Sequence, residues 1–218
     1  MIQVPFVDLK KQYKNLKDEI LPRVEELFEN GSFIMGENVL DFEKNVSKYL
    51  GQEALGCASG SDALLLSLMA MGVKEGDEII TTAFTFFATA GAIARLGAIP
   101  VFVDINIDDY NIDPLKIEAA ITERTKAIFL VHLLGQPAKI KEIKDFCEEK
   151  NLVLIEDCCE STGAKVDGVK VGNFGVMGSF SFYFGHHMTT IEGGMVFTLD
   201  FYFYSFLYSS LSLFFFFF

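Results

Sequence analysis

Short, almost continuous apolar runs recur along the middle of this chain, and stretches with helical periodicity separate them. The runs are DEIITT (77–82), IPVFVDI (99–105), TKAIFLVHL (125–133) and NLVLIED (151–157). Strands that are buried on both faces have this continuous hydrophobicity. The alternation of strand and helix therefore predicts an α/β three-layer sandwich with a mostly parallel central sheet. Ligands of such folds bind at the carboxyl ends of the strands.

Helical periodicity marks both the start of the chain and the segments between the runs. Apolar residues such as Ile20, Val24 and Leu27 predict an amphipathic helix, and a second helix follows the loop NGSFIMGEN. The expected helices are 10–30, 39–50, 61–71, 86–96, 114–120 and 140–150. We expect one domain over residues 1–200, long enough to bury a substantial core.

The charge and the cysteines exclude several classes of protein. A formal net charge of −12 without a basic stripe argues against a nucleic-acid partner, because the phosphate backbone would repel the surface. The 4 cysteines have no CxxC spacing, which favours reduced thiols over a disulfide framework. The amino terminus lacks the apolar run of a signal peptide. We therefore expect a cytoplasmic protein.

The composition changes abruptly at residue 201. From there to residue 218 the chain reads FYFYSFLYSSLSLFFFFF, without a charge, glycine or proline. We interpret residues 201–218 as a low-complexity, artefactual tail that arose by frameshift, truncation or read-through. The alternative is a genuine membrane anchor or aggregation-prone segment, because the length reaches the lower limit for a membrane-spanning helix.

A helix start is predicted within CASGSDALLLSLMA (57–70). Ser59, Gly60 and Ser61 precede the apolar helix, and Asp62 lies in its first turn. The N–H groups and dipole of a helix start bind phosphate, and glycine permits a close approach. An ordinary N-cap explains the same residues. The segment alone leaves both interpretations open.

Two carboxylates end the run in LVLIEDCCES (152–161). An acidic side chain at the carboxyl end of a strand, such as Glu156 or Asp157, points into the expected ligand crevice. Capping of the next turn explains such an Asp equally well. Both interpretations again remain open.

The segment GSFSFYFGHHMTTIEGGMVFT (178–198) combines an alternating strand (179–183), His186, His187 and a Glu-Gly-Gly turn before another strand. Histidines adjacent in sequence seldom share one metal, and no HxxxH or CxxC spacing accompanies them, so we expect no metal site. An ordinary surface or core histidine is the alternative for each one.

Taken in order, these segments resemble the DegT/DnrJ/EryC1/StrS family of sugar aminotransferases, a branch of the fold type I enzymes that use pyridoxal 5′-phosphate. The resemblance implies the large domain of that fold. Relatives continue into a small domain that is missing here, and their active sites usually lie at a dimer interface. The resemblance runs from Val4 to Asp200 and includes VPFVDLKKQY (4–13), SGSDAL (59–64), residues 76–105, VHLLGQPA (131–138), LVLIEDCCESTGA (152–164), GSFSFY (178–183) and EGGMV (192–196).

The resemblance also implies roles for individual residues. Gly60 and Ser61 would hold the cofactor phosphate through backbone N–H groups and a hydroxyl, and Ser181 would add a second hydroxyl. Phe86 aligns with the aromatic residue that stacks on the pyridine ring. Asp157 aligns with the carboxylate that pairs with the ring nitrogen. A nearby negative charge favours the protonated ring, which then acts as an electron sink.

The chain departs from most of the family at two of these positions. Ordinary members carry, five residues after the serine that aligns with Ser181, a lysine that binds the cofactor aldehyde covalently, but this chain carries His186. Imidazole cannot form that bond, although it transfers protons near neutral pH. Glu160 stands where many relatives have Gln. We place it in the cofactor site without a role, and bonding within its own turn is the alternative.

The histidine resembles a small subgroup of the family. These are dehydratases that remove the 3-hydroxyl from nucleotide-linked 4-keto-6-deoxysugars, with pyridoxamine 5′-phosphate as cofactor and a histidine as base. FYFGHHMTTIEGG (182–194) resembles their version of the motif. The resemblance therefore implies a homodimeric 3-dehydratase in surface polysaccharide biosynthesis with His186 as base. A sugar aminotransferase and a relative without catalytic activity are the alternatives.

Overall fold

The computed structural model describes residues 8–216. The start of the segment VPFVDLKKQY (4–13) and the last two residues of the tail (201–218) therefore lie outside the described residues. The chain forms two compact units, with the boundary between Phe42 and Glu43. The predicted first helix is α1 (Leu9–Asn30). Asp8 caps its start by accepting a hydrogen bond from the Lys11 N–H. Gly31 ends it in the left-handed conformation that glycine favours.

Seven strands of the second unit form the main sheet, in the order β1-β9-β8-β5-β4-β2-β3. Among the described strand pairs of this sheet, only the two that include β9 are antiparallel, so the predicted mostly parallel sheet is confirmed. The strands are β1 (Glu53–Cys57), β2 (Glu78–Thr81), β3 (Ile99–Phe102), β4 (Thr125–Val131), β5 (Val153–Asp157), β8 (Met177–Ser181) and β9 (Gly194–Thr198).

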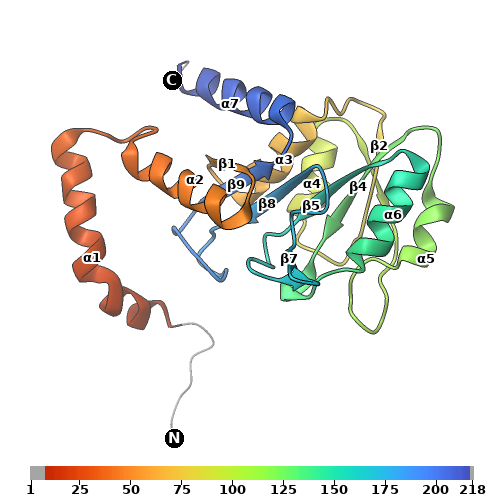
Figure 1. Cartoon of the computed structure of the whole chain (residues 1–218), viewed down its shortest axis with the longest axis horizontal. Coiled ribbons are helices and arrows are strands. Elements are labelled where there is room, and N and C mark those ends of the chain that lie inside the picture. Colours follow the sequence, from red (N-terminus) through yellow and green to blue (C-terminus); the bar gives the residue numbers. More distant parts are fainter. Residues whose placement is uncertain (1–7, 217–218) are drawn as a thin grey trace, which may run out of the picture. The chain divides into compact units, whose positions relative to one another are not determined.

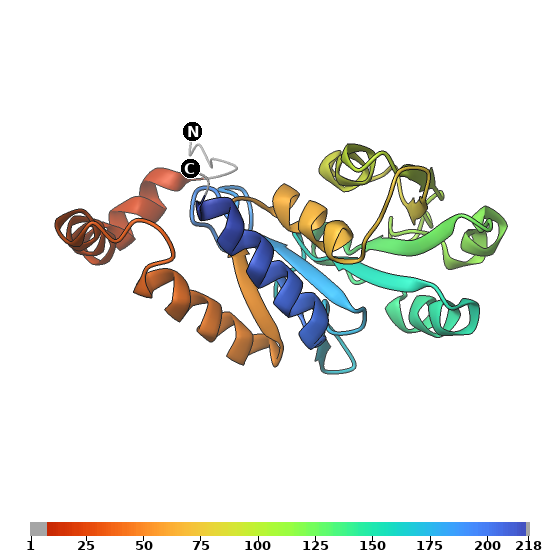
Figure 2. The same cartoon turned by 90° about the horizontal axis from the view of Figure 1, so that it is seen from above.

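Successive side chains of each strand point to opposite faces, and each face buries its own core. Ile155 of β5 lies in the core beneath α3, α4 and α7, whereas Leu154 lies in the core beneath α5 and α6. Figures 1 and 2 show α3 and α6 on opposite sides of the sheet, which confirms the three layers. These helices are α3 (Gly60–Ala70), α4 (Ala88–Arg95), α5 (Pro114–Ile117), α6 (Ile140–Lys150) and α7 (Phe201–Phe216).

Some short elements were not predicted. The edge strand β1 has too few apolar residues to stand out. The hairpin of β6 (Lys165–Val166) and β7 (Val169–Lys170) turns at Asp167 and Gly168, both with positive φ. Asp-Gly is a recognised hairpin signal. The remaining elements are α2 (Glu37–Leu50) and two 3₁₀ turns, Glu118–Ala120 and Leu133–Gly135.

The phenylalanine-rich tail continues the second unit as a helix. The Asp200 side chain caps α7 by accepting a hydrogen bond of 2.8 Å from the Tyr202 N–H. Leu207 is 1% exposed and joins the core beneath α3. The end of the domain at residue 200 and the artefactual origin of the tail stay predictions. No helix within residues 8–216 is long and apolar enough to cross a membrane.

Candidate active site

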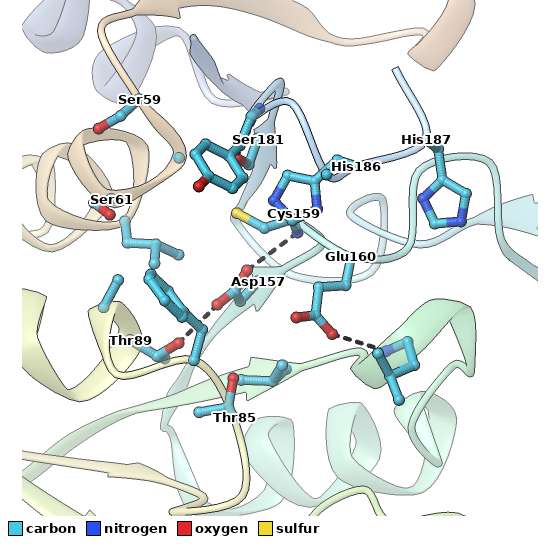
Figure 3. Close-up of a pocket in the computed structure, with 18 of the residues that line it drawn as sticks. Ser59, Ser61, Thr85, Thr89, Asp157, Cys159, Glu160, Ser181, His186 and His187 are labelled. Atoms are coloured by element: carbon cyan, nitrogen blue, oxygen red, sulfur yellow. Dashed lines mark hydrogen bonds between the residues drawn. The ribbon is translucent and has the colours of Figure 1, made fainter. Parts of the chain in front are cut away.

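A pocket of about 800 Å³ lies at the carboxyl edge of the parallel strands, where the sheet topology predicts ligands. Loops that follow β1, β2, β4, β5 and β8 line it. Figure 3 shows Ser61, Asp157, Glu160, Ser181 and His186 around this one pocket. All the site residues named from the sequence line it: Gly60, Ser61, Phe86, Asp157, Glu160, Ser181 and His186.

The start of α3 forms one wall of the pocket. The Ser59 hydroxyl accepts a hydrogen bond of 3.1 Å from the Asp62 N–H, so Ser59 is an N-cap. The N–H groups of Gly60 and Ser61 belong to the first turn, where no earlier helical carbonyl is available to them. The N-cap and phosphate interpretations are therefore compatible, because different groups of the same turn serve them.

Close packing explains why glycine occupies position 60. A β-carbon there would lie 2.5 Å from the β-carbon of Ser181, on a strand more than a hundred residues later. Gly194 similarly faces the backbone of Ser59 without room for a side chain. These contacts bring the helix start and the end of β8 together at one side of the pocket.

Asp157 ends β5 with a nearly buried carboxylate, 4% exposed. Its Oδ2 accepts a hydrogen bond of 2.8 Å from the Thr89 hydroxyl, and its Oδ1 accepts one of 3.1 Å from the Cys159 N–H. A carboxylate has about four acceptor positions, so Asp157 retains capacity for a donor in the pocket. It caps the following turn and also faces the ligand space, as both interpretations required.

The loop between β8 and β9 carries both histidines. His186 is half-buried and His187 is exposed, although both line the pocket. Burial lowers the pKa of His186 below its ordinary 6.5, and His187 lowers it further, against the opposing effects of the Glu160 and Asp157 carboxylates. At neutral pH the imidazole is therefore mostly uncharged and free to accept a proton.

Glu160 bonds outside its own turn, which corrects the alternative drawn from the sequence. Its Oε2 accepts a hydrogen bond of 3.0 Å from the Leu134 N–H, in the loop after β4. Leu134 has a positive φ of 49°, which is unusual for a residue with a side chain. The hydrogen bond links the loop after β4 to the loop after β5, at two residues that both line the pocket.

Phe86 lies before α4, because that helix begins at Ala88, two residues later than predicted. The Phe86 ring is 60% exposed and lies 4.6 Å from the Phe87 ring, centre to centre.

Sequence reasoning did not single out Thr89, whose hydroxyl donates a hydrogen bond to Asp157, or Cys159. Burial and the Asp157 carboxylate raise the pKa of the Cys159 thiol well above its ordinary value, so it stays protonated.

A second group of ionisable side chains lies on the opposite face of the sheet. His132, Glu156 and Cys158 are buried, and one potential ligand atom of each lies within 4.8 Å of the others. The His132 Nδ1 accepts a hydrogen bond from the Ala138 N–H, so its Nε2 carries the proton and donates to Glu156 at 3.0 Å. Both imidazole nitrogens are thus engaged within the protein.

Glu156 is equally well satisfied. Besides His132, three backbone N–H groups donate to its carboxylate at 2.6–2.7 Å, those of Gly172, Phe174 and Gly175. A metal ion would have to displace several of these bonds. The group is therefore a hydrogen-bonded network that ties the ends of β4 and β5 to the loop before β8.

Solved structures place this architecture in a class of proteins. An aminotransferase from Brucella abortus superposes with a TM-score of 0.91 at 36% identity, over 95% of this chain and 58% of that one. A GDP-4-keto-6-deoxymannose-3-dehydratase with a trapped PLP–glutamate geminal diamine superposes with a TM-score of 0.80 at 37% identity, over 84% of this chain and 50% of that one. The chain has the large-domain fold of the pyridoxal-phosphate-dependent enzymes of fold type I.

Sequence comparison identifies the family. A model of the DegT/DnrJ/EryC1/StrS aminotransferase family matches residues 14–205, and the chain belongs to this family. The family depends on pyridoxal phosphate, and one structural neighbour, NtdA from Bacillus subtilis, has bound pyridoxamine phosphate (TM-score 0.89, 31% identity, 95% of this chain and 47% of that one).

Curated relatives carry different names. A pleiotropic regulatory protein of Geobacillus stearothermophilus is 46% identical over 91% of this chain and 54% of its own length. A UDP-N-acetyl-3-dehydro-α-D-glucosamine 3-aminotransferase of Acidithiobacillus ferrooxidans is 43% identical, over 90% and 54%. A GDP-4-keto-6-deoxy-D-mannose 3-dehydratase of Yersinia pseudotuberculosis is 39% identical, over 83% and 48%. The chain spans about half the length of the curated relatives it matches.

Proposed function

We propose that this chain forms the cofactor domain of a pyridoxamine-phosphate-dependent 3-dehydratase that acts on a nucleotide-linked 4-keto-6-deoxyhexose. The product would serve surface polysaccharide biosynthesis in the cytoplasm. One observation carries the proposal: His186 lines the pocket, and none of the described residues that line it is a lysine. An enzyme without a pocket lysine cannot hold its cofactor covalently, but it retains a base of suitable pKa.

The residues present fit the cofactor. Gly60 and Ser61 at the start of α3, with the hydroxyl of Ser181, would hold the phosphate through neutral donors. Asp157 would accept a hydrogen bond from the ring nitrogen, since the Thr89 hydroxyl and the N–H and thiol of Cys159 do not fill all of its about four acceptor positions. Phe86 would pack on the ring.

His186 supplies the proton transfer in this proposal. When bound, pyridoxamine phosphate supplies an amine that condenses with the 4-keto group and a ring that accepts electrons. The uncharged imidazole of His186, which lines the pocket, accepts a proton at its unprotonated nitrogen. Burial lowers its pKa and so keeps this nitrogen free at neutral pH. Glu160, bonded to the Leu134 N–H, keeps a carboxylate in the same pocket, where it favours the protonated imidazole.

A sugar aminotransferase is the second candidate, because the Acidithiobacillus relative bears that name. It would need a lysine from outside the pocket described here. The dehydratase is favoured by the histidine and by the Yersinia relative, which is named a 3-dehydratase.

We also propose a homodimer, supported by exposed aromatic side chains at and near the pocket, namely Phe84, Phe86, Phe87 and Tyr110.

Reductive trapping tests the proposal on the full chain. Each variant is incubated with a stoichiometric amount of pyridoxal phosphate, reduced with borohydride, digested and mapped by mass spectrometry. We expect no covalent cofactor on the wild-type protein and a defined adduct at position 186 in His186→Lys. His187→Lys is the matched control, because it introduces the same amine one residue away on an exposed side chain.

The outcomes separate the candidates. An adduct on a native lysine of the wild-type protein would overturn the dehydratase proposal and favour the aminotransferase. Equal trapping by His186→Lys and His187→Lys would remove the assignment of His186 as base. Release of water from a GDP-linked 4-keto-6-deoxyhexose by the wild-type protein with pyridoxamine phosphate, but not by His186→Asn, would support the dehydratase.

A further inference from the structure

The loop that carries His186 is bridged from within by one side chain. The Thr189 hydroxyl donates a hydrogen bond of 2.9 Å to the Phe182 carbonyl at the start of the loop. The same oxygen accepts one of 2.9 Å from the Ile191 N–H near the end of the loop. Thr189 is half-buried, and its hydroxyl joins a residue before His186 in the sequence to a residue after it.

The backbone of this loop requires such support. Ile191 has a φ of 74°, a conformation that is costly for a β-branched residue. Its side chain is 76% exposed and contributes no buried contact that would offset the cost. The hydrogen bond from the Ile191 N–H to Thr189 is therefore a direct restraint on the strained residue.

The next threonine makes a different interaction. The Thr190 hydroxyl donates to the Glu192 carbonyl at 2.7 Å, two residues away, and the residue is exposed. This bond closes a local turn without reaching the start of the loop. The two hydroxyls thus differ in span, because only that of Thr189 reaches Phe182, which the Thr190 residue contacts through its backbone N–H instead.

We propose that Thr189 is a positioning residue that holds the His186 imidazole in the pocket by closing the loop between Phe182 and Ile191. The inference rests on the proposed function for the catalytic role of His186. The hydrogen bonds by which Thr189 holds the loop do not depend on that role.

Backbone hydrogen bonds also close the loop, from the Thr190 N–H to the Phe182 carbonyl at 3.0 Å and from the Phe182 N–H to the Gly193 carbonyl at 2.9 Å. Without the Thr189 hydroxyl these bonds would remain, but the restraint on Ile191 would be lost and His186 would be held less firmly. Thr189→Ser should retain the function, because serine supplies the same hydroxyl.

Trapping in the His186→Lys background tests the position directly. We expect Thr189→Val to lower the yield of the adduct at position 186 about tenfold, which corresponds to ~1.4 kcal/mol. Thr189→Ser should keep most of the yield. Thr190→Val is the matched control, because it removes a hydroxyl from the same loop and should leave the yield unchanged. Equal yields for Thr189→Val and Thr190→Val would overturn the proposal.

A titration of His186 by NMR supplies a second readout that needs no cofactor. Because burial is the main cause of its lowered pKa, Thr189→Val should raise the pKa of His186 toward 6.5, whereas Thr190→Val should not. If His186→Lys alone traps no cofactor, the proposed function fails, but this titration still decides the role of Thr189. An unchanged pKa in folded Thr189→Val would overturn the positioning role.

Discussion

Glu156 and Asp157 are adjacent carboxylates at the end of the same strand, yet they lie in two differently organised regions. Glu156 faces the α5 and α6 side, where His132 and three backbone N–H groups surround it completely. Asp157 faces the pocket, where Thr89 and Cys159 occupy only part of its acceptor capacity. One carboxylate is closed to ligands, and the other is open to them.

The comparison teaches that charge and burial alone do not identify a functional carboxylate. Glu156 is 0% exposed and Asp157 is 4% exposed, so exposure hardly separates them. The number of donors already committed does separate them, because a carboxylate with every acceptor position filled has nothing to offer a ligand. Matched amide substitutions should therefore affect different properties. Glu156→Gln should mainly lower stability, and Asp157→Asn should mainly weaken cofactor binding.

The largest effect is expected for Glu156→Gln. The amide keeps the shape, but its NH₂ group meets buried backbone donors in place of an acceptor. We expect the free energy of unfolding to fall by about 3–5 kcal/mol, measured by urea denaturation. Among variants that remain folded, pyridoxamine phosphate should still bind. A loss below ~1 kcal/mol would show that the network is not closed as described.

The next largest effect concerns the helix that covers the pocket side of the sheet. Leu207 of α7 is 1% exposed, so Leu207→Ala should lower the free energy of unfolding by about 2–3 kcal/mol. Tyr202→Ala, at a residue 71% exposed in the same helix, is the control and should change it by less than ~0.5 kcal/mol. Equal, small effects would indicate that α7 is dispensable and that the pocket side is stabilised without the tail.

Asp157→Asn should affect binding more than stability. The amide oxygen of the asparagine still accepts one hydrogen bond, and its NH₂ group can donate to the Thr89 hydroxyl in place of accepting from it. The free energy of unfolding should therefore change by less than ~1 kcal/mol. Loss of the charge should weaken pyridoxamine phosphate binding about 10- to 100-fold, measured by isothermal titration calorimetry. Unchanged affinity would contradict the assignment of Asp157 to the ring nitrogen.

The smallest expected effects are changes in the pKa of His186, which an NMR titration measures. The Glu160 and Asp157 carboxylates raise this pKa, so Glu160→Gln and Asp157→Asn should each lower it further, whereas His187→Gln should raise it. Folded Glu156→Gln should leave it unchanged, which sharpens the contrast between the two faces. An effect of Glu156→Gln as large as that of Asp157→Asn would contradict that contrast.

The lowered pKa also gives stability a defined pH dependence. The folded state holds the proton on His186 less tightly than the unfolded chain, whose histidine has a pKa near 6.5. As pH falls below 6.5, protonation favours the unfolded state, and the free energy of unfolding decreases. His186→Gln should remove this component from the acid limb of a pH–stability curve, and an unchanged limb would refute it.

The sequence by itself determined the α/β sandwich, the start of α3 near Gly60 and several of the residues that line the pocket, but not Thr89 or Cys159. Continuous apolar runs specify buried parallel strands, and the ordered motifs specify the family. These signals are local, because each depends on residues close together in the chain. Helix boundaries moved by a residue or two, as at α4, whereas β3 ends three residues before the end of its predicted run.

Only the tertiary structure decided which neighbouring carboxylate is open, where Glu160 bonds and how residues 201–216 pack. Thr89 and Asp157 are separated by 68 positions, and Leu134 and Glu160 by 26. Alternation along β5 places Glu156 and Asp157 on opposite faces, but the donors that each face provides come from distant loops. Partners brought together by strand order and loop closure leave no periodic signal in a single sequence, which is why these interactions emerge only in the folded chain.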